Sequence, residues 1–252
     1  MAKLIFLGTA AAVADAKHEN THLAVVTERR LLLIDCPGNP VVRMQHAGID
    51  LTHRLTDLLL THFHPDHISG LPLLLQTLWL LGRTEPLHVH GMDFTLHQSQ
   101  RLFNLYDWET WSEMFPLVYH EIPEQERYMA LDAAELRLYT SPMSHYVPTL
   151  GVRVELPASR FSLAFSSDTR PCPEMTRLAQ DVDILIHEAT GAHTGHSSAA
   201  QAGEIAHQAK AKALYLIHYP VWETDPAPLV EQAKMMFDGE VHLAEDYQVV
   251  EI

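Results

Sequence analysis

Residues 62–67 constrain this chain more than any other segment, because four of these six side chains are of types that bind metal ions. Their sequence is His62-Phe63-His64-Pro65-Asp66-His67. Residues 57–60 before them are apolar and predict a strand, whereas residues 69–83 after them form a longer, largely apolar run that predicts a helix. The hexapeptide is therefore expected in a turn between a strand and a helix.

This turn can present its side chains to two neighbouring positions. Alternate residues of an extended segment share one face, so His62 and His64 point in the same direction. The following residues then present Asp66 and His67 to a second position. A mixed set of imidazole and carboxylate ligands is what zinc and manganese accept, so the segment predicts a pair of divalent metal ions.

A second histidine pair has a different interpretation. The chain has 18 histidines, so another His-x-His pair is expected by chance, and His88-Val89-His90 is one. It lies in the strand-like residues 87–91, and we expect no carboxylate and no third histidine near it. We interpret this pair as structural.

The length and composition favour one ordered domain. A chain of 252 residues can close a single core, so we expect one α/β domain over residues 1–252. Hydrophobic residues make up 47% of the chain and charged residues 19%, with no repeat or low-complexity linker. This composition argues against intrinsic disorder.

The charge of the chain bears on its partners. There are 17 basic and 32 acidic residues, which gives a net charge of −15, and the basic residues form no local patch. Such a surface repels polyphosphates, so RNA is disfavoured as a partner and a small-molecule substrate is favoured.

The cysteines and the apolar runs bear on the compartment. Cys36 and Cys172 are far apart in the sequence and predict neither a disulfide framework nor a thiolate metal site, as is typical of the cytoplasm. No segment reaches the roughly 18 consecutive apolar residues of a membrane span, so we expect a cytoplasmic protein with no membrane partner.

Strand and helix patterns alternate along the chain. Strands are predicted at residues 3–7, 22–26, 31–35, 57–60, 136–140, 150–155, 161–165, 184–187, 213–217 and 247–252. Helices are predicted at residues 69–83, 93–105, 174–180, 197–210 and 226–237. Elements of this number and order predict sheets covered by helices.

Three further polar residues each follow one of these strands. They are His145, Asp168 and His218. Loops at strand ends are where sheets present reactive side chains. Any one of the three is as well explained by a cap or a turn, but together with the hexapeptide they supply the ligands that two metal ions need.

Ordered motifs along most of the chain resemble the metallo-β-lactamase superfamily, and more narrowly its ribonuclease Z branch. The motifs are Phe6-Leu7-Gly8-Thr9, Leu33-Ile34-Asp35-Cys36, residues 61–72 with Gly70-Leu71-Pro72, Thr84-Glu85-Pro86-Leu87, Ser167-Asp168-Thr169-Arg170-Pro171, His187-Glu188-Ala189-Thr190, Gly195-His196-Ser197-Ser198 and Ile217-His218-Tyr219. The resemblance implies a four-layer αββα sandwich.

The resemblance also implies a ligand set for two divalent metal ions, zinc or alternatively manganese. One ion would be bound by His62, His64 and His145. The other would be bound by Asp66, His67 and His218, with Asp168 bridging both. Two cations lower the pKa of a shared water and stabilise negative charge on a phosphoryl or acyl group. Asp66 would also orient that water as a base.

A leaving group needs a proton, and His196 is the candidate donor because histidine holds a proton near neutral pH. Ser197 is expected to open the next helix, whose N-terminus disfavours imidazolium unless a carboxylate compensates. Glu188 is the candidate for that carboxylate. The alternatives are a capping or loop role for His196 and a structural hydrogen-bonding role for Glu188.

One feature departs from the long-arm, tRNA-processing members of the resembled family. Those members carry an arm that grips the tRNA body between the motifs matching His145 and Asp168. Here these residues are only 23 positions apart (168 − 145), so no arm fits. With the charge of −15, this departure disfavours tRNA as the substrate.

These observations predict a two-metal hydrolase that cleaves phosphodiester bonds, with small or cyclic phosphodiesters as substrates. The alternatives are tRNA 3′ processing, hydrolysis of a lactone or carboxylic ester, and a metal-binding protein without turnover. Trp108, Trp111 and Phe115 lie in an acidic stretch that has three interpretations: a lid over the site, a homodimer contact, or ordinary surface packing.

Overall fold

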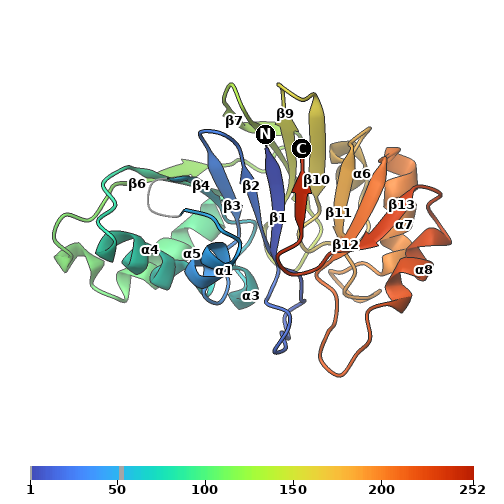
Figure 1. The fold of residues 1–252 in the computed structure, drawn as a ribbon, viewed down its shortest axis with the longest axis horizontal. Helices are drawn as coiled ribbons and strands as arrows, with labels where there is room; N and C mark the ends of the chain where they lie inside the picture. Colours follow the sequence, from blue (N-terminus) through green and yellow to red (C-terminus); the bar gives the residue numbers. More distant parts are fainter. Residues whose placement is uncertain (1, 51–53) are drawn as a thin grey trace.

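The computed structural model describes residues 2–50 and 54–252 and contains two facing β-sheets with helices on their outer sides (Figure 1). The first sheet has the strand order β14-β1-β2-β3-β4-β5-β6 and the second β13-β12-β11-β10-β9-β8-β7. The expected four-layer αββα sandwich is therefore confirmed.

The strands of the first sheet are β1 (Lys3–Gly8), β2 (His22–Val26), β3 (Leu31–Ile34), β4 (Leu55–Leu59), β5 (Leu87–Gly91), β6 (Leu117–Glu121) and β14 (Val249–Glu251). Those of the second are β7 (Tyr128–Asp132), β8 (Arg137–Met143), β9 (Thr149–Leu156), β10 (Phe161–Phe165), β11 (Ile184–Glu188), β12 (Ala213–Ile217) and β13 (Glu240–Leu243). The helices are α1 (Pro40–His46), α3 (Pro65–Ile68), α4 (Leu71–Leu80), α5 (Asp93–Asn104), the 3-10 turn η1 (Trp108–Thr110), α6 (Pro173–Leu178), α7 (Ala199–Ala209) and α8 (Pro228–Lys234).

The apolar runs of the central strands are explained by burial on both faces. In β1, Leu4 and Phe6 enter the core between the sheets, whereas Ile5 and Leu7 enter the core beneath the helices of the first sheet. A third core lies between the second sheet and α6, α7 and α8. Strands buried on both faces have continuous rather than alternating hydrophobicity.

Strand direction brings the loops with reactive side chains to one edge of the sandwich. β3, β4, β5 and β6 pair in parallel, and so do β10, β11, β12 and β13. β8 runs in the same direction as β10, because both pair antiparallel with β9. Parallel strands end at the same edge of their sheet, so the segments after β8, β10 and β12 lie together. A hydrogen bond of 3.0 Å from Ser167 Oγ to Thr61 Oγ1 brings the segment after β4 of the first sheet beside them.

The elements that the sequence patterns did not predict share a physical cause. β6, β7 and β13 are edge strands, and their side chains are mostly half-buried or exposed. Edge strands lack the continuous apolar runs on which the strand predictions depend. α1 is only seven residues long. The helix predicted at residues 69–83 is shorter, since Gly70 separates α3 from α4.

The structural interpretation of His88 and His90 needs one correction. A carboxylate and a third histidine do lie beside them, supplied by neighbouring strands. Asp57 Oδ1 lies 3.1 Å from His90 Nε2, and His120 Nε2 lies 2.8 Å from His88 Nδ1. These contacts link β4, β5 and β6 across the sheet, which sequence proximity could not reveal.

The aromatic stretch after α5 packs against the core. Trp108 stacks on Phe103 at 5.3 Å, and Trp111 stacks on Trp79 at 4.8 Å. Phe115 is buried in the cluster beneath the helices of the first sheet. These residues pack within the first sheet's helix layer and do not line the cavity over the metal cluster, which argues against a lid. A homodimer contact stays a prediction. Within the described ranges, every helix is too short or too polar to cross a membrane.

The contact between α7 and α8 gives a test of the fold. A Cβ at Gly203 would lie 2.4 Å from the carbonyl oxygen of Ala233. Gly203→Ala would stabilise an unobstructed helix by about 1 kcal/mol. Here we expect a loss of about 1–3 kcal/mol in the free energy of unfolding, because α8 must move. Urea denaturation measures this, with Glu204→Ala on the same helix as a control that changes little. A stabilised Gly203→Ala protein would contradict the packing described.

Candidate metal centre

Three histidines and one carboxylate form the first group of possible ligands. They are His62, His64, His145 and Asp168, whose ligand atoms all lie within 4.8 Å of one another. His64 Nδ1 lies 3.1 Å from His62 Nε2 and 3.2 Å from His145 Nε2. Asp168 Oδ2 lies 3.9 Å from His62 Nε2 and 3.7 Å from His145 Nε2.

The second group uses the other oxygen of the same carboxylate. It consists of Asp66, His67, Asp168 and His218. Asp168 Oδ1 lies 3.4 Å from both His67 Nε2 and His218 Nε2. Asp66 Oδ2 lies 3.6 Å from His67 Nε2 and 3.5 Å from His218 Nε2. The two oxygens of Asp168 thus face two different groups.

The hexapeptide reaches both groups because its backbone changes direction at Pro65. His64 is extended (φ −112°, ψ 151°), and Pro65 then occupies the first turn of α3, where its fixed φ suits a helix start. Gly70 follows this turn and packs directly against the loop after β3. A Cβ at this position would lie 2.6 Å from the carbonyl oxygens of Cys36 and Gly38. The backbone N–H of Cys36 also donates to His67 O at 2.8 Å.

The remaining ring nitrogens of the histidines are held by hydrogen bonds. His67 Nδ1 lies 2.8 Å from Asp35 Oδ2, and His145 Nδ1 lies 2.8 Å from the Gly195 carbonyl. His218 Nδ1 lies 2.9 Å from Thr190 Oγ1. In a neutral imidazole, a proton on Nδ1 satisfies each of these contacts and leaves Nε2 with the lone pair that metal ligation needs. The three Nε2 atoms point into the two groups.

Charge within the cluster perturbs the pKa of its members. Burial alone would lower the pKa of His67, but the carboxylates of Asp168 and Asp35 outweigh burial and raise it well above its usual range. Burial would raise the pKa of Asp168, but His218, His67 and His62 hold it well below its usual range. Burial lowers the pKa of His62, since fewer carboxylates compensate there.

The donor set fits divalent metal ions. Among the described residues, His67 Nε2, His218 Nε2 and Asp168 Oδ1 are buried and lack a hydrogen-bond partner. Leaving such groups unpaired costs about 1–3 kcal/mol each. Ligand atoms of a tetrahedral zinc site with bonds of about 2.0–2.1 Å lie about 3.4 Å apart, close to the spacing found here. All three atoms belong to the second group, so one cation there would satisfy them.

Glu188 and His196 form a pair beside these groups, as the sequence suggested without showing the contact. His196 Nδ1 lies 3.0 Å from Glu188 Oε1, which also accepts from the backbone N–H of Thr169 at 2.7 Å. Burial lowers the pKa of His196, but Glu188 outweighs it and the pKa is raised. The next helix begins later than expected, because Ser198 rather than Ser197 is its N-cap.

A cavity of about 450 Å³ opens over the cluster. His64, Asp66, Asp168, His196 and His218 line it, so four of the seven candidate ligands and the candidate proton donor face the same space. Ligand cavities usually have volumes of about 300–1,000 Å³, which makes this one suited to a small molecule.

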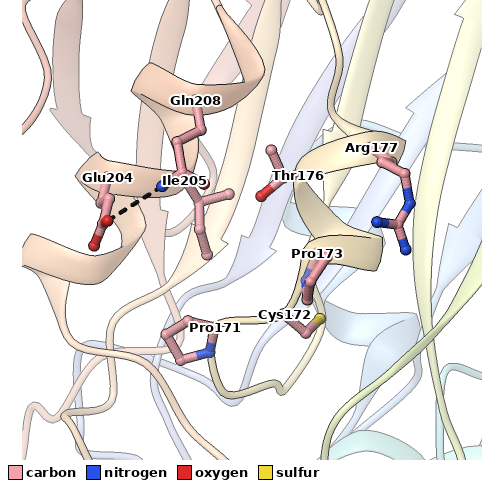
Figure 2. Close-up of a pocket in the computed structure, with 8 residues that line it drawn as sticks. All are labelled: Pro171, Cys172, Pro173, Thr176, Arg177, Glu204, Ile205 and Gln208. Atoms are coloured by element: carbon pink, nitrogen blue, oxygen red, sulfur yellow. Dashed lines mark hydrogen bonds between the residues drawn. The ribbon is translucent and has the colours of Figure 1, made fainter.

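A second cavity, of about 340 Å³, lies between α6 and α7 and contains none of these residues (Figure 2). Its charged groups already have partners within the protein. Arg177 pairs with Glu126 and Glu174, and Glu204 accepts from Gln208 at 3.1 Å. We assign no chemistry to this cavity.

All seven residues predicted as metal ligands come together at the edge of the sandwich. The residues that hold them in place were not identified as such from the sequence. Asp35, Thr61, Thr190 and Gly195 all belong to motifs quoted above, which was the available signal. Their contacts with the candidate ligands become visible only in the fold. Asp35 and His218 also have left-handed backbone (φ 62° and 50°), a strain that concentrates at functional sites.

Comparison with known proteins identifies the family. The profile of the family described as "Anti-Pycsar protein Apyc1" matches residues 2–241. The chain belongs to this family. A curated relative of this Apyc1-family chain, named Ribonuclease Z, from Myxococcus xanthus, is 28% identical over 310 aligned positions, which cover 99% of this chain and 97% of the relative.

Solved structures share the fold of this Apyc1-family chain. The metallo-β-lactamase fold protein YhfI from Bacillus subtilis has a TM-score of 0.84 at 23% identity, covering 100% of this chain and 99% of that one. The short form of human tRNase Z has a TM-score of 0.81 at 23% identity, covering 99% of each chain. The chain is thus a ribonuclease Z-like, metal-dependent hydrolase of the metallo-β-lactamase superfamily, as the motifs implied.

The hydrogen bond from His67 to Asp35 gives a test of the site. We expect Asp35→Asn to weaken divalent metal binding by about 10- to 100-fold, because the neutral amide no longer fixes the imidazole or raises its basicity. Asparagine tolerates the left-handed backbone at this position. Competition with a chelator measures the affinity.

Asp57→Asn is the matched control for this test, because it alters another buried aspartate–histidine pair, with His90. We expect it to leave metal affinity within about twofold of the unaltered protein, since it shares no partner with the site. Equal metal affinity in Asp35→Asn and the unaltered protein would contradict the positioning role of Asp35.

Proposed function

We propose that this protein hydrolyses small or cyclic phosphodiesters with two divalent metal ions, zinc or manganese, bound by the seven residues named above. The observation that carries the proposal is the placement of Asp168, whose two oxygens face two separate histidine groups at 3.4–3.9 Å. A carboxylate in this position suits a bridge between two cations. When bound, such a pair lowers the pKa of water and neutralises charge on phosphoryl oxygens.

The surrounding residues have distinct roles in the proposed reaction. Asp66, which lies in the second group and also lines the cavity, orients the attacking water and accepts its proton. His196 donates a proton to the leaving oxygen, and Glu188 keeps His196 protonated through the 3.0 Å hydrogen bond. Thr190 and Asp35 hold two of the histidines in the orientation that ligation requires.

Three observations favour a small substrate over tRNA. β9 and β10 form a hairpin that occupies most of the interval between His145 and Asp168, leaving no arm there. The alignment with the Myxococcus relative spans 310 positions, more than the 252 residues of this chain, so that relative carries segments absent here. The net charge of −15 also opposes contact with a polyphosphate backbone.

Lactone or carboxylic-ester hydrolysis is the second candidate, because the same metal pair would activate water against a carbonyl group. The Glu188–His196 pair serves either reaction, since both expel an alkoxide that needs a proton. The phosphodiester is favoured by the resemblance of residues 187–190 and 195–198 to ribonuclease Z motifs.

A parallel assay tests the substrate class. We expect protein loaded with zinc or manganese to hydrolyse bis(p-nitrophenyl) phosphate and a cyclic nucleotide, and a chelator to abolish both activities. Homoserine lactone and precursor tRNA are the competing substrates. Hydrolysis of the lactone alone would overturn the proposal. Accurate cleavage of precursor tRNA with no cyclic-nucleotide activity would favour tRNA 3′ processing as the function.

The same assay on variants tests the role of Asp168. We expect Asp168→Asn to lower kcat by about 10³-fold, since a bridge that stabilises charge by several kcal/mol is lost. Asp183→Asn is the control, because Asp183 pairs with Lys212 at 2.6 Å and takes no part in the cavity. Equal activity of both variants would contradict the assignment.

The pH profile tests the Glu188–His196 pair. A proton donor must be protonated, so kcat falls as pH rises through the pKa of His196, and a raised pKa extends activity to higher pH. Glu188→Gln removes the carboxylate that raises this pKa. We therefore expect the alkaline limb to move to lower pH, with a larger loss at pH 8 than at pH 6. A loss that is equal at every pH would show that Glu188 only supports the fold.

A further inference from the structure

One wall of the cavity over the metal cluster is apolar. It consists of Ala11, Ala12, Val13, Pro220, Val221 and Trp222, which we call the apolar wall. These residues belong to the loop after β1 and the loop after β12, which extend beyond the same edge of the sandwich (Figure 1). A backbone hydrogen bond of 3.0 Å from Ala11 N to Tyr219 O joins the two loops. The apolar wall is thus one continuous surface.

Trp222 is held at this wall by an ordered loop. Tyr219 and Val221 are buried, and the Tyr219 hydroxyl donates to Ala244 O at 2.6 Å. Trp222 itself is 58% exposed and lies outside the three core clusters. Within the described part of the chain, no hydrogen bond or ring contact involves its indole. A large aromatic surface therefore faces the cavity without a partner in the protein, and such surfaces mark binding sites.

The polar lining of the cavity limits the charge of the occupant. It consists of His64, Asp66, Tyr146, Asp168, Thr190, His193, His196 and His218, so no lysine or arginine lines the cavity. A second phosphate, beyond the one that reacts at the metal groups, would find no permanent cation and would lie near two carboxylates. A substrate with a single negative charge fits this lining.

The position of His196 assigns the two ester substituents to opposite parts of the site. The His196 ring lies 4.9 Å from that of His145 and 6.1 Å from that of His218. Its distance to the Tyr146 ring is also 6.1 Å, so His145 is the nearest of the three rings. The leaving group that His196 protonates is therefore placed beside His145. The substituent that stays on phosphorus then extends along the His218 side, toward Trp222.

We propose that Trp222 is a specificity-determining residue that packs against a planar, aromatic substituent on the retained side of a singly charged phosphodiester. This inference rests on the proposed phosphodiesterase function and adds a substrate feature to it. Stacking of a planar group on an aromatic side chain strengthens binding by roughly 5- to 150-fold.

Two esters with the same leaving group isolate this contact. Methyl p-nitrophenyl phosphate and phenyl p-nitrophenyl phosphate both release p-nitrophenol and differ only in the retained substituent. We expect Trp222→Ala to reduce the phenyl-to-methyl ratio of kcat/KM by about 10-fold relative to the unaltered protein, mainly through KM. The different chemical reactivities of the two esters cancel when the ratio in the variant is divided by the ratio in the unaltered protein. Turnover of the methyl ester stays within about twofold, since it lacks the stacking group.

Two further variants control the experiment. Trp222→Phe keeps an aromatic face and retains most of the phenyl preference. Tyr106→Ala removes another exposed aromatic, 55% exposed, that does not line the cavity, and it leaves the ratio unchanged. A phenyl preference that persists in Trp222→Ala overturns the inference. Equal losses on both esters also overturn it, because they indicate a structural role.

A binding measurement separates this inference from the proposed function. Methyl phenylphosphonate and methyl methylphosphonate carry their distinguishing group on a phosphorus–carbon bond, which cannot leave. Calorimetry on the metal-loaded protein is expected to find the phenyl compound bound about 10-fold more tightly, with the difference lost in Trp222→Ala. If no diester is cleaved but this difference holds, the proposed function fails and the inference stands. If diesters are cleaved without any phenyl preference, only the inference fails.

Discussion

The structure depends on one buried carboxylate that lies between two groups of histidines. Asp168 is almost fully buried, and each of its oxygens faces imidazoles from a different group. A carboxylate removed from water costs several kcal/mol unless nearby positive charge compensates it. The imidazoles provide part of that charge and hold the pKa of Asp168 low, and divalent cations would provide the rest. The electrostatics of the cluster thus favour cations at these positions.

The fold supplies this arrangement because the ligands follow strands that end at one edge. His62 and His64 follow β4, His145 follows β8, Asp168 follows β10 and His218 follows β12. The three buried cores fix these strands, so the ligand positions are set by sheet packing rather than by the loops alone. Loop residues then adjust the side chains, as Thr190 does for His218 and Gly195 does for His145.

The sequence predicted which candidate ligands come together better than it predicted the frame around them. The hexapeptide could be recognised because its spacing and residue types are improbable outside a metal site. The other three candidates, His145, Asp168 and His218, could be recognised because each follows an apolar strand. Edge strands such as β6 and β13 were missed, since half-exposed strands carry weak patterns. The partners of His90 were also missed, because Asp57 reaches it only through the pairing of β4 with β5. Contacts of this kind depend on register, which local patterns do not encode.

The aromatic residues show the same limit. Trp108, Trp111 and Trp222 are the same residue type, but they have different surroundings. Trp108 and Trp111 pack against the helices of the first sheet, whereas Trp222 lines the cavity. Only the path of the chain distinguishes them. The cavity therefore has candidate metal ligands that could be predicted from the sequence, and an apolar wall that could not.

Anomalous diffraction from crystals grown with zinc or manganese tests the central claim most directly. The account predicts two peaks about 3.5–4 Å apart, one on each side of the Asp168 carboxylate. The first would contact His62, His64 and His145, and the second would contact Asp66, His67 and His218. A single peak, or a pair of peaks that Asp168 does not touch, would contradict the account.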